Sequence, residues 1–445
     1  MTVPQVPVPE TAIPETETDG WVRLHPLTPL LRGGRFLLVA LAIVGQQGLR
    51  DASLEVFLAV VGVGVPAAIT IGWLLWRAMR YRLTDTELQV ESGVLTRRSR
   101  RVPLARLQSV DVVRPLFARI LGLAELRLEV VGGSGGAEAP LSYLGEQEAH
   151  QLRARLLDLA AGRSAGDNSA PAEPEQVLVV VPVGPLVWST LLGPPLVVGV
   201  GLVVVLVIAA VVDLTLVGGV LLGAVPLLIG VGSFAVRRML TEYGFTVAES
   251  GDGLRLSHGL LETRSSTIPA GRVQTVRITE PLLWRPFGWA RVEVDVAGYS
   301  AGSGEEQTST GALLPVAPRE FAHRLVARVL GGAPPPVGDR PPRAARWRAP
   351  LSHRRLAIGL DAAHLVSTHG VLTTTTEVVP LARVQSLRLS QGPLQRRLGL
   401  TSLHVDTAGR RLPGTVAPHR GDAEAARVLA DTTTLARAAR AASAP

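Results

Sequence analysis

Cysteine and lysine are both absent from the 445 residues of this chain. Without cysteine, disulfides and thiolate metal sites are excluded. Without lysine, all 45 basic residues are arginine, and they exceed the 37 acidic residues to give a net charge of +8. This balance favours attraction to anionic surfaces but does not choose between lipid and nucleic acid. Aromatic residues make up only 4% of the chain, and the densest arginine cluster has no aromatic neighbour, which disfavours a nucleic-acid surface.

Catalytic and metal-binding patterns are missing as well. The nine histidines form no His-x-x-x-His or HExxH pattern, so surface or hydrogen-bonded histidines are favoured over a metal site. The glycine-rich stretch 132–140 follows a strand pattern and lacks the Gly-Lys-Ser/Thr ending of a phosphate loop, so we expect a hairpin loop. No Ser/His/Asp set can be assembled. The sequence therefore predicts a protein without catalysis, cofactor or metal.

The first twenty residues contain four acids, four prolines and no basic residue. A secretory signal needs a basic start and an apolar stretch, and this segment has neither. Its composition is typical of a disordered tail, which we expect to be cytoplasmic.

Long apolar runs are concentrated in two blocks. Residues 54–76, 186–212 and 214–236 each reach the length of about 20 residues that spans a bilayer core, and only Asp213 separates the last two. Residues 36–49 are fewer and would extend only about 21 Å as a helix. They span if the helix begins near Leu30 and nearby arginines extend to the surface; otherwise the segment is re-entrant or interfacial. The sequence thus predicts two transmembrane hairpins.

The placement of arginine predicts the orientation of these hairpins. Arginines flank their outer ends, whereas the turns between helices contain Arg50 and Asp213 with two further acids. The positive-inside rule therefore places both turns outside and every large polar segment, with both termini, in the cytoplasm. The helix interiors lack ionisable residues, which favours plain anchors over a transport path. The flanking residues are Arg32, Arg35, Arg77, Arg80, Arg237 and Arg238.

One sequence frame occurs three times, at 93–122, 259–288 and 370–399. Seven columns are identical in all three copies, which is a strong signal of an internal repeat. The columns are Gly93/Gly259/Gly370, Leu95/Leu261/Leu372, Pro103/Pro269/Pro380, Arg106/Arg272/Arg383, Gln108/Gln274/Gln385, Arg119/Arg285/Arg396 and Gly122/Gly288/Gly399. We interpret them as structural rather than functional columns.

Each copy has the alternation of β-strands and closes with a helical pattern. This order predicts a small antiparallel sandwich or barrel with a helix across one end. The first repeated glycine is expected to supply a positive-φ turn between strands, and the proline to end a strand. The repeated arginine that follows can hydrogen-bond exposed carbonyls or pair with the acidic column Glu129/Asp295/Asp406.

A hairpin followed by G-x-L…P-x-x-R-x-Q…R-x-x-G, repeated, resembles the multi-pass membrane proteins of the second bacterial PH class, which include the YdbT-type proteins. The resemblance extends over nearly all of the chain beyond residue 20. It implies a pleckstrin-homology-like barrel, present three times, and no established catalytic activity. The third copy departs most, since no hairpin precedes it. The expected order is a tail at 1–20, hairpin 1 at 21–80, unit 1 at 81–162, a linker at 163–176, hairpin 2 at 177–240, unit 2 at 241–332, a Pro/Arg linker at 333–349 and unit 3 at 350–445.

Unit 1 differs from the others in charge at four aligned positions. It has Arg97, Arg98, Arg100 and Arg101, whereas the same positions carry net charges of +1 in unit 2 and −1 in unit 3. The frame therefore does not require the charge. Either this is a solvated strand, or it contacts anionic lipid headgroups, each arginine contributing about 1 kcal/mol.

These patterns predict a non-catalytic inner-membrane protein that presents three cytoplasmic PH-like units. We expect it to act in lipid-surface or protein scaffolding for envelope maintenance, with membrane lipids and a protein or second copy as partners and no nucleic acid. The alternative is a transporter or lipid-handling protein that uses the four helices as a path.

Overall fold

The computed structural model describes residues 21–26, 28, 62, 66, 70, 73–74, 76–93, 97–130, 141–160, 176–251, 253–269, 271–296, 311–408 and 415–443. Four of the predicted segments lie wholly or largely outside this range. They are the acidic tail, hairpin 1, the glycine-rich stretch 132–140 and the linker that follows unit 1.

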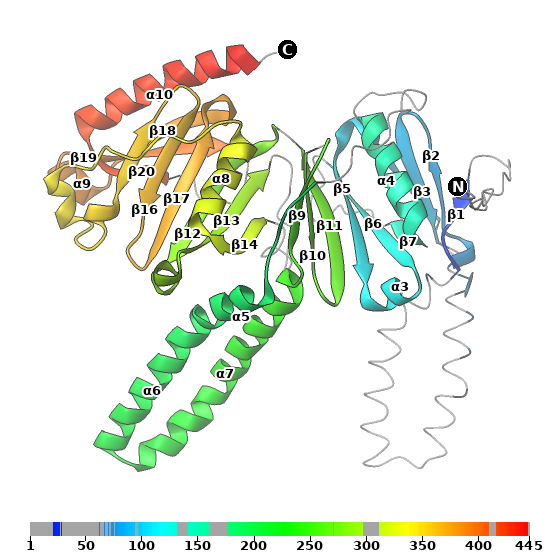
Figure 1. Cartoon of the computed structure of the whole chain (residues 1–445), viewed down its shortest axis with the longest axis horizontal. Helices are drawn as coiled ribbons and strands as arrows, with labels where there is room; N and C mark the ends of the chain where they lie inside the picture. The colour runs from blue at the N-terminus through cyan, green and yellow to red at the C-terminus, as the bar shows by residue number, and fades with distance from the viewer. Residues whose placement is uncertain are drawn as a thin grey trace, which may run out of the picture.

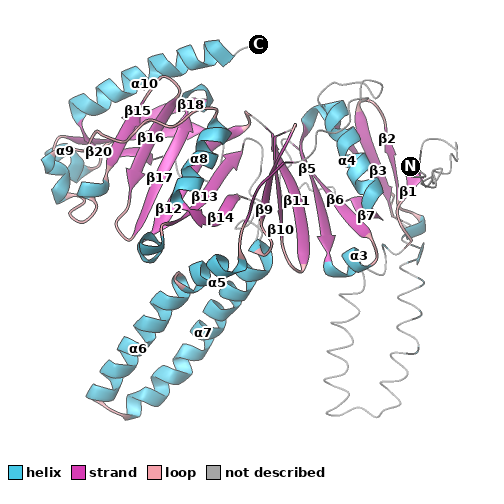
Figure 2. Cartoon of the chain, viewed as in Figure 1, coloured by secondary structure: helices cyan, strands magenta, loops and turns pink. Residues whose placement is uncertain are grey.

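The described strands form four antiparallel sheets, which follow one another along the long axis of the molecule (Figures 1 and 2). The first sheet has the order β1 (Val22–Arg23), β2 (Arg80–Leu83), β3 (Glu87–Ser92), β4 (Arg98–Pro103). The second has the order β7 (Leu141–Gly145), β6 (Leu123–Val130), β5 (Leu107–Pro115), β11 (Glu262–Pro269), β10 (Gly253–His258), β9 (Thr246–Ser250), β8 (Gln176–Val180). The third has the order β14 (Ala312–Pro318), β13 (Trp289–Val296), β12 (Val273–Pro281), β17 (Thr373–Pro380), β16 (His364–His369), β15 (Ala357–Leu360). The fourth has the order β18 (Val384–Ser390), β19 (Leu400–Thr407), β20 (Thr415–Gly421).

The sheets do not coincide with the repeats. Within each unit the strands divide into an N-terminal half and a C-terminal half, and the C-terminal half of one unit joins the N-terminal half of the next in a single sheet. The pairs that join them are β5 with β11 and β12 with β17. The expectation of separate sandwiches missed this arrangement, because alternation along a strand does not say which strand lies beside it.

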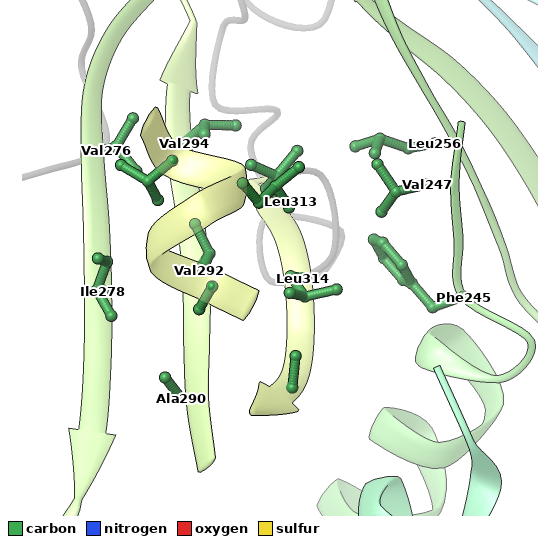
Figure 3. Close-up of a cluster of buried hydrophobic side chains, with 14 of the residues drawn as sticks. Phe245, Val247, Leu256, Val276, Ile278, Ala290, Val292, Val294, Leu313 and Leu314 are labelled. Carbon is green, nitrogen blue, oxygen red and sulfur yellow. The ribbon is translucent and has the colours of Figure 1, made fainter. Parts of the chain in front are cut away.

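The hydrophobic cores do follow the repeats. In unit 2, Phe245, Val247 and Leu256 of the N-terminal half face Val292 and Leu314 of the C-terminal half (Figure 3). Unit 1 has its own core between its two halves and α4, and unit 3 has two smaller clusters against α10. Burying these apolar side chains holds the two halves of each unit together.

The first glycine and the proline of the frame occupy the predicted positions. The glycine has φ of 104°, 110° and 97° in units 1, 2 and 3. At Gly259 and Gly370 an added Cβ would collide with the carbonyl oxygen of Glu262 or Thr373, so no other residue fits these turns. The repeated proline ends β4, β11 and β17, where it removes no ladder donor.

A helix closes each unit, as the periodicity predicted. These helices are α4 (Glu146–Ala160), α8 (Arg319–Leu330) and α10 (Asp422–Ser443). A shorter helix lies between the first two strands of each C-terminal half: α3 (Leu116–Ile120), the 3-10 helix η2 (Leu282–Phe287) and α9 (Pro393–Arg397).

The last glycine of the frame follows each short helix and lies on the surface. Its three copies are exposed and have φ of 67°, 63° and 61°: Gly122, Gly288 and Gly399. An added Cβ would meet no atom within 4 Å at Gly122 or Gly288, and only the Asp422 carboxylate, at 4.0 Å, at Gly399. This column is therefore structural through its left-handed backbone, which ends the short helix, and not through close packing.

The carbonyl of the same glycine also begins the closing helix. It accepts the first backbone N–H of that helix, from Arg319 to Gly288 at 2.7 Å in unit 2 and from Asp422 to Gly399 at 3.2 Å in unit 3. The first N–H groups of a helix have no partner within the helix, so this bond satisfies one of them.

Three apolar helices project from unit 2: α5 (Val183–Leu191), α6 (Pro194–Val212) and α7 (Thr215–Glu242). The helices α6 and α7 pack against each other and extend away from the sheets (Figure 1). The spans Val183–Val212 and Thr215–Glu242 are long and apolar enough to cross a membrane, and their side chains are mostly exposed. The helical conformation is interrupted between α5 and α6 at Gly193, before the two prolines that begin α6. Strand β8 (Gln176–Val180) pairs with β9, and its residues from Val177 onward were expected to begin hairpin 2.

Candidate functional site

The two unit–unit junctions are formed by equivalent strands in the same register. At junction 1–2, the strand pair β5·β11, Pro115 is opposite Glu262. At junction 2–3, the strand pair β12·β17, Pro281 is opposite Thr373. In the repeated frame Pro115 aligns with Pro281, and Glu262 aligns with Thr373. The repeat therefore encodes how units join as well as how each unit folds.

Among the described residues, each junction has an ion pair with a buried carboxylate, and the two pairs have opposite polarity. At junction 1–2 the Arg264 guanidinium on β11 lies 2.6 Å from the Asp111 carboxylate on β5. At junction 2–3 the positive charge is on the other strand: Arg277 of β12 lies 2.5 Å from Glu377 of β17. Asp111 and Arg277 occupy the same position of the frame. Removing one member of such a pair leaves an uncompensated buried charge.

The repeated arginine of the short helices joins each unit to the next. Arg119 of α3 donates to the Thr263 hydroxyl of unit 2 at 3.2 Å. Arg285 of η2 donates to the Thr374 hydroxyl of unit 3 at 2.6 Å and to the Val371 carbonyl at 2.9 Å. Thr263 and Thr374 are aligned, so this column has an inter-unit role that the sequence alone did not reveal.

The hairpin base, where α5 and α7 meet unit 2, is fixed by buried polar contacts. Glu242 at the end of α7 accepts hydrogen bonds from Arg238 at 2.9 Å and from Arg291 of β13 at 2.7 Å. Trp284 of η2 is buried below the Arg238 guanidinium and donates its indole N–H to the Ser189 carbonyl of α5 at 3.2 Å. The apolar hairpin and unit 2 are therefore rigidly connected.

His258 of β10 belongs to the same region. Its ring stacks on Phe245 with a centroid distance of 5.1 Å, and its Nδ1 lies 2.7 Å from the Thr241 carbonyl of α7. A carbonyl accepts only from a protonated nitrogen, so Nδ1 carries the proton of the neutral ring. Burial lowers the pKa of His258, while the bond to Thr241 opposes that shift.

The four arginines for which either lipid contact or a solvated strand was expected lie on and beside β4. This strand is the outer edge of its sheet, with β3 as its sheet neighbour among the described strands. Arg97, Arg100 and Arg101 are exposed, whereas Val102 is buried in the unit 1 core. Position 98 is opposite Ser92 of β3. Among the described strands, the segment 97–101 therefore follows the edge of its sheet.

The repeated arginine after the proline lies in the bend between the two halves of a unit, and the repeated glutamine is the second residue of the strand that follows. Arg106 and Arg383 end the short 3-10 turns η1 (Leu104–Arg106) and η6 (Leu381–Arg383) that connect these halves. The buried Gln274 donates to the carbonyl of Arg272 at 3.1 Å, and so closes the equivalent bend of unit 2. Gln385 is exposed on β18, so the glutamine column is not buried in every unit.

The acidic column considered as a partner for these arginines has another partner in unit 3. Asp406 accepts two hydrogen bonds from Arg388, both at 2.8 Å, and one from Ser386. These bonds lower the pKa of Asp406 to about 2.

The described residues contain no group of three or more His, Asp or Glu side chains that could hold a metal ion. An open pocket of about 550 Å³ in unit 3 is lined by Arg340, Arg354 and Arg355, together with Thr368 and Thr374. Its lining has hydrogen-bond donors and positive charge without a carboxylate, so its chemistry suits a small anion.

Comparison with known proteins agrees with this architecture. The sequence pattern of the bacterial PH domain family matches residues 36–160, 196–333 and 337–435. The UPF0699 transmembrane protein YdbT of Bacillus subtilis (strain 168) is 25% identical over 263 residues, which cover 54% of this chain and 52% of YdbT. The chain thus spans about half the length of this curated relative. No solved structure gives a significant match. Each matched segment contains one copy of the repeated frame, and together they cover most of the chain, which therefore belongs to the bacterial PH domain family.

Proposed function

We propose that this protein is a non-catalytic, multi-pass scaffold that holds three PH-like units at the cytoplasmic face of the bacterial inner membrane, where it serves the maintenance of the cell envelope. One observation carries the proposal: the buried network of Glu242, Arg238 and Arg291 fixes an apolar hairpin to unit 2. A rigid connection sets both the height and the orientation of the units above the bilayer. Scaffolding requires such a defined presentation.

A second observation supports contact between unit 1 and the membrane surface. Figure 1 shows α3 on the same side of the sheets as α6 and α7. Phe117 and Ile120 of α3 are 65% and 72% exposed. Large apolar side chains exposed beside a membrane anchor favour insertion at the headgroup boundary.

The basic cluster of β4 completes the proposed lipid surface. Arg97, Arg98, Arg100 and Arg101 attract anionic headgroups, which adds about 1 kcal/mol per arginine near the surface. The repeated columns are proposed as braces of the fold and of its junctions, not as ligand-binding residues.

Cysteine labelling tests the proposed orientation, because the chain has no native cysteine. An impermeant maleimide should label Ser53→Cys or Leu214→Cys in intact cells, and should label Ser99→Cys only after lysis. Ser99 lies on β4, and Leu214 lies in the turn between α6 and α7. The reverse pattern would contradict a cytoplasmic location of the units.

Lipid contact is tested in proteoliposomes with a nitroxide at Ser99→Cys. Its accessibility to a lipid-bound relaxing agent should rise when anionic phosphatidylglycerol replaces phosphatidylcholine. The effect should weaken in salt, since screening shortens from about 10 Å at 0.1 M to about 3 Å at 1 M. Replacing the four arginines with the unit 3 residues Thr, Thr, Glu and Val should remove it. An unchanged, salt-independent signal would show that the strand is only solvated.

The competing function is transport or lipid handling through the helices. It would need a polar path, and α6 contains no ionisable residue. Proteoliposomes that move a dithionite-accessible fluorescent lipid or a trapped solute faster than protein-free vesicles would favour this alternative over the scaffold.

A further inference from the structure

Among the strands that the structure describes, the series of joined units has two open ends, β4 and β18. Strand β4 is an edge strand, although the equivalent strands β11 and β17 each receive the preceding unit. Strand β18 is an edge strand too, although its equivalents β5 and β12 each receive the following unit. Most of β18 is exposed, from Gln385 to Ser390. By the register of both junctions, β18 of one molecule could pair with β4 of a second copy.

Three positions of the frame decide the charge at a junction. The first is the ion-pair position on the strand that the preceding unit contributes. It is occupied by Asp111 on β5, Arg277 on β12 and Arg388 on β18. Its partner is Arg264 at junction 1–2 and Glu377 at junction 2–3. On β4, the positions of these two partners are both arginine, at Arg98 and Arg100.

We propose that these charges form a pairing code, which fixes the order of the units and prevents a second copy from extending the series through β4 and β18. If β5 paired with β17, Asp111 would lie against Glu377. If β12 paired with β11, Arg277 would lie against Arg264. Each of these brings like charges together where burial strengthens their repulsion. The correct pairings are the two that place opposite charges together.

At the open ends the same rule excludes self-association. Docking of β18 on β4 would bring Arg388 against Arg98 and Arg100. The inter-unit arginine of the short helix, Arg396 in unit 3, would meet Arg97 in place of the threonine that Arg119 and Arg285 bind. Asp406 binds the Arg388 guanidinium, whereas the sequence places four arginines at 97, 98, 100 and 101, on and directly before β4. An open strand edge otherwise invites pairing with another chain.

The proposal is tested by exchanging the charges of the two open strands in the full chain, in nanodiscs or detergent. The triple variant Arg97→Thr, Arg98→Thr, Arg100→Glu gives β4 the residues of β17 at these positions. A head-to-tail contact that does not close generates open chains, so the mass of this variant should rise with concentration, by about twofold or more over the wild type. The single variant Arg388→Glu should also associate, because its β18 then complements the arginines of β4.

The variant that combines the triple substitution with Arg388→Glu decides between the outcomes. It brings the two introduced carboxylates together, so it should return to the wild-type mass in light scattering. A matched control, Arg155→Glu with Arg346→Glu, makes the same change in net charge as the triple variant, at exposed sites of α4 and η4 (Arg343–Trp347), and should not associate. The code is overturned if neither the triple nor the single variant associates. It is equally overturned if the control associates, or if the combined variant remains associated.

Discussion

Asp111 and Arg264 are 153 residues apart in the chain, yet the carboxylate of one and the guanidinium of the other form a buried ion pair across two units. The pair connects β5 of unit 1 to β11 of unit 2. Long-range pairs of this kind make the fold of one unit depend on its neighbour.

Asp111→Ala should therefore destabilise the protein strongly. The uncompensated Arg264 would cost about 3–5 kcal/mol, whereas replacing both residues with apolar ones of similar volume is often neutral or stabilising. Urea unfolding in detergent, followed by circular dichroism, should show a lower midpoint for Asp111→Ala and a recovery in Asp111→Leu with Arg264→Met. The control Asp85→Ala removes an exposed carboxylate and should leave the midpoint unchanged.

Trp284→Ala should loosen the connection between hairpin 2 and unit 2. The side chain is 2% exposed, and removing a buried tryptophan costs about 3–5 kcal/mol. A lower thermal midpoint and faster proteolysis near Gly244 are the expected results. Trp347 is 81% exposed, so Trp347→Ala should behave like the wild type. Equal effects of the two substitutions would contradict a packed hairpin base.

His258 should make the hairpin base sensitive to acid. Because burial lowers the pKa of His258 in the folded protein, the unfolded state binds more protons at acidic pH. Its contribution to stability is therefore complete above the unfolded pKa of about 6.5 and is lost as pH falls below that value. Thermal midpoints from pH 8 to pH 5 should fall more steeply for the wild type than for His258→Gln. Arg264, Glu242 and Asp111 also face this ring, so parallel slopes would assign the acid sensitivity to other groups.

Arg285→Ala should weaken junction 2–3 without disturbing junction 1–2. It removes the hydrogen bonds to Thr374 and Val371 at a half-buried site, where such a bond contributes about 0.5–1.5 kcal/mol. Hydrogen exchange should become faster in β17 and remain unchanged in β11. The reciprocal variant, Arg119→Ala, should affect β11 and leave β17 unchanged.

The brace proposed for the repeated arginine of the bends needs a direct test. If Arg383 supports the connection between β17 and β18, Arg383→Ala should lower the thermal midpoint of the full chain. The free energy of unfolding should fall by about 1–3 kcal/mol. Asp406 is held by Arg388, so the effect should persist in an Asp406→Asn background. Wild-type behaviour of Arg383→Ala would mean that this column does not brace the fold.

Local features of this fold followed from the sequence. The turn at Gly259, the strand end at Pro269 and the helix from Arg319 are all set by residues close in the chain, so their patterns sufficed. The family was also evident from the repeated frame, and the three matched segments confirm it.

The last glycine of the frame was understood only in part. Its identity in three copies indicated a structural task, but not which one. In the structure Gly288 and Gly399 are exposed, and each connects a short helix to a strand through a left-handed backbone while its carbonyl begins the closing helix. That second task depends on a helix that starts 31 residues after Gly288, at Arg319, so no local pattern could show it.

The partners of each strand were not predictable in the same way. Alternation in β5 and β11 shows which side chains face a core, but both strands could have remained edges of separate sandwiches. The pairing is specified by single charges, such as Arg277 and Glu377, whose partners lie 100 residues away. The inter-unit role of Arg285 was hidden for a related reason: an identical column indicates a shared task, and the task was assumed to lie within the unit.

The division between cores and sheets has a consequence for any attempt to cut the chain. Each core belongs to one repeat, but the two central sheets each belong to two. A cut in the linker at 163–176 or at 333–349 therefore separates sequence repeats without separating structural parts. An excised third repeat would carry the unprotected edge of β17 and a buried Glu377 stripped of Arg277. The smallest autonomous piece is therefore larger than the repeat, and truncation series planned on the repeat boundaries would report aggregation where they intend to report function.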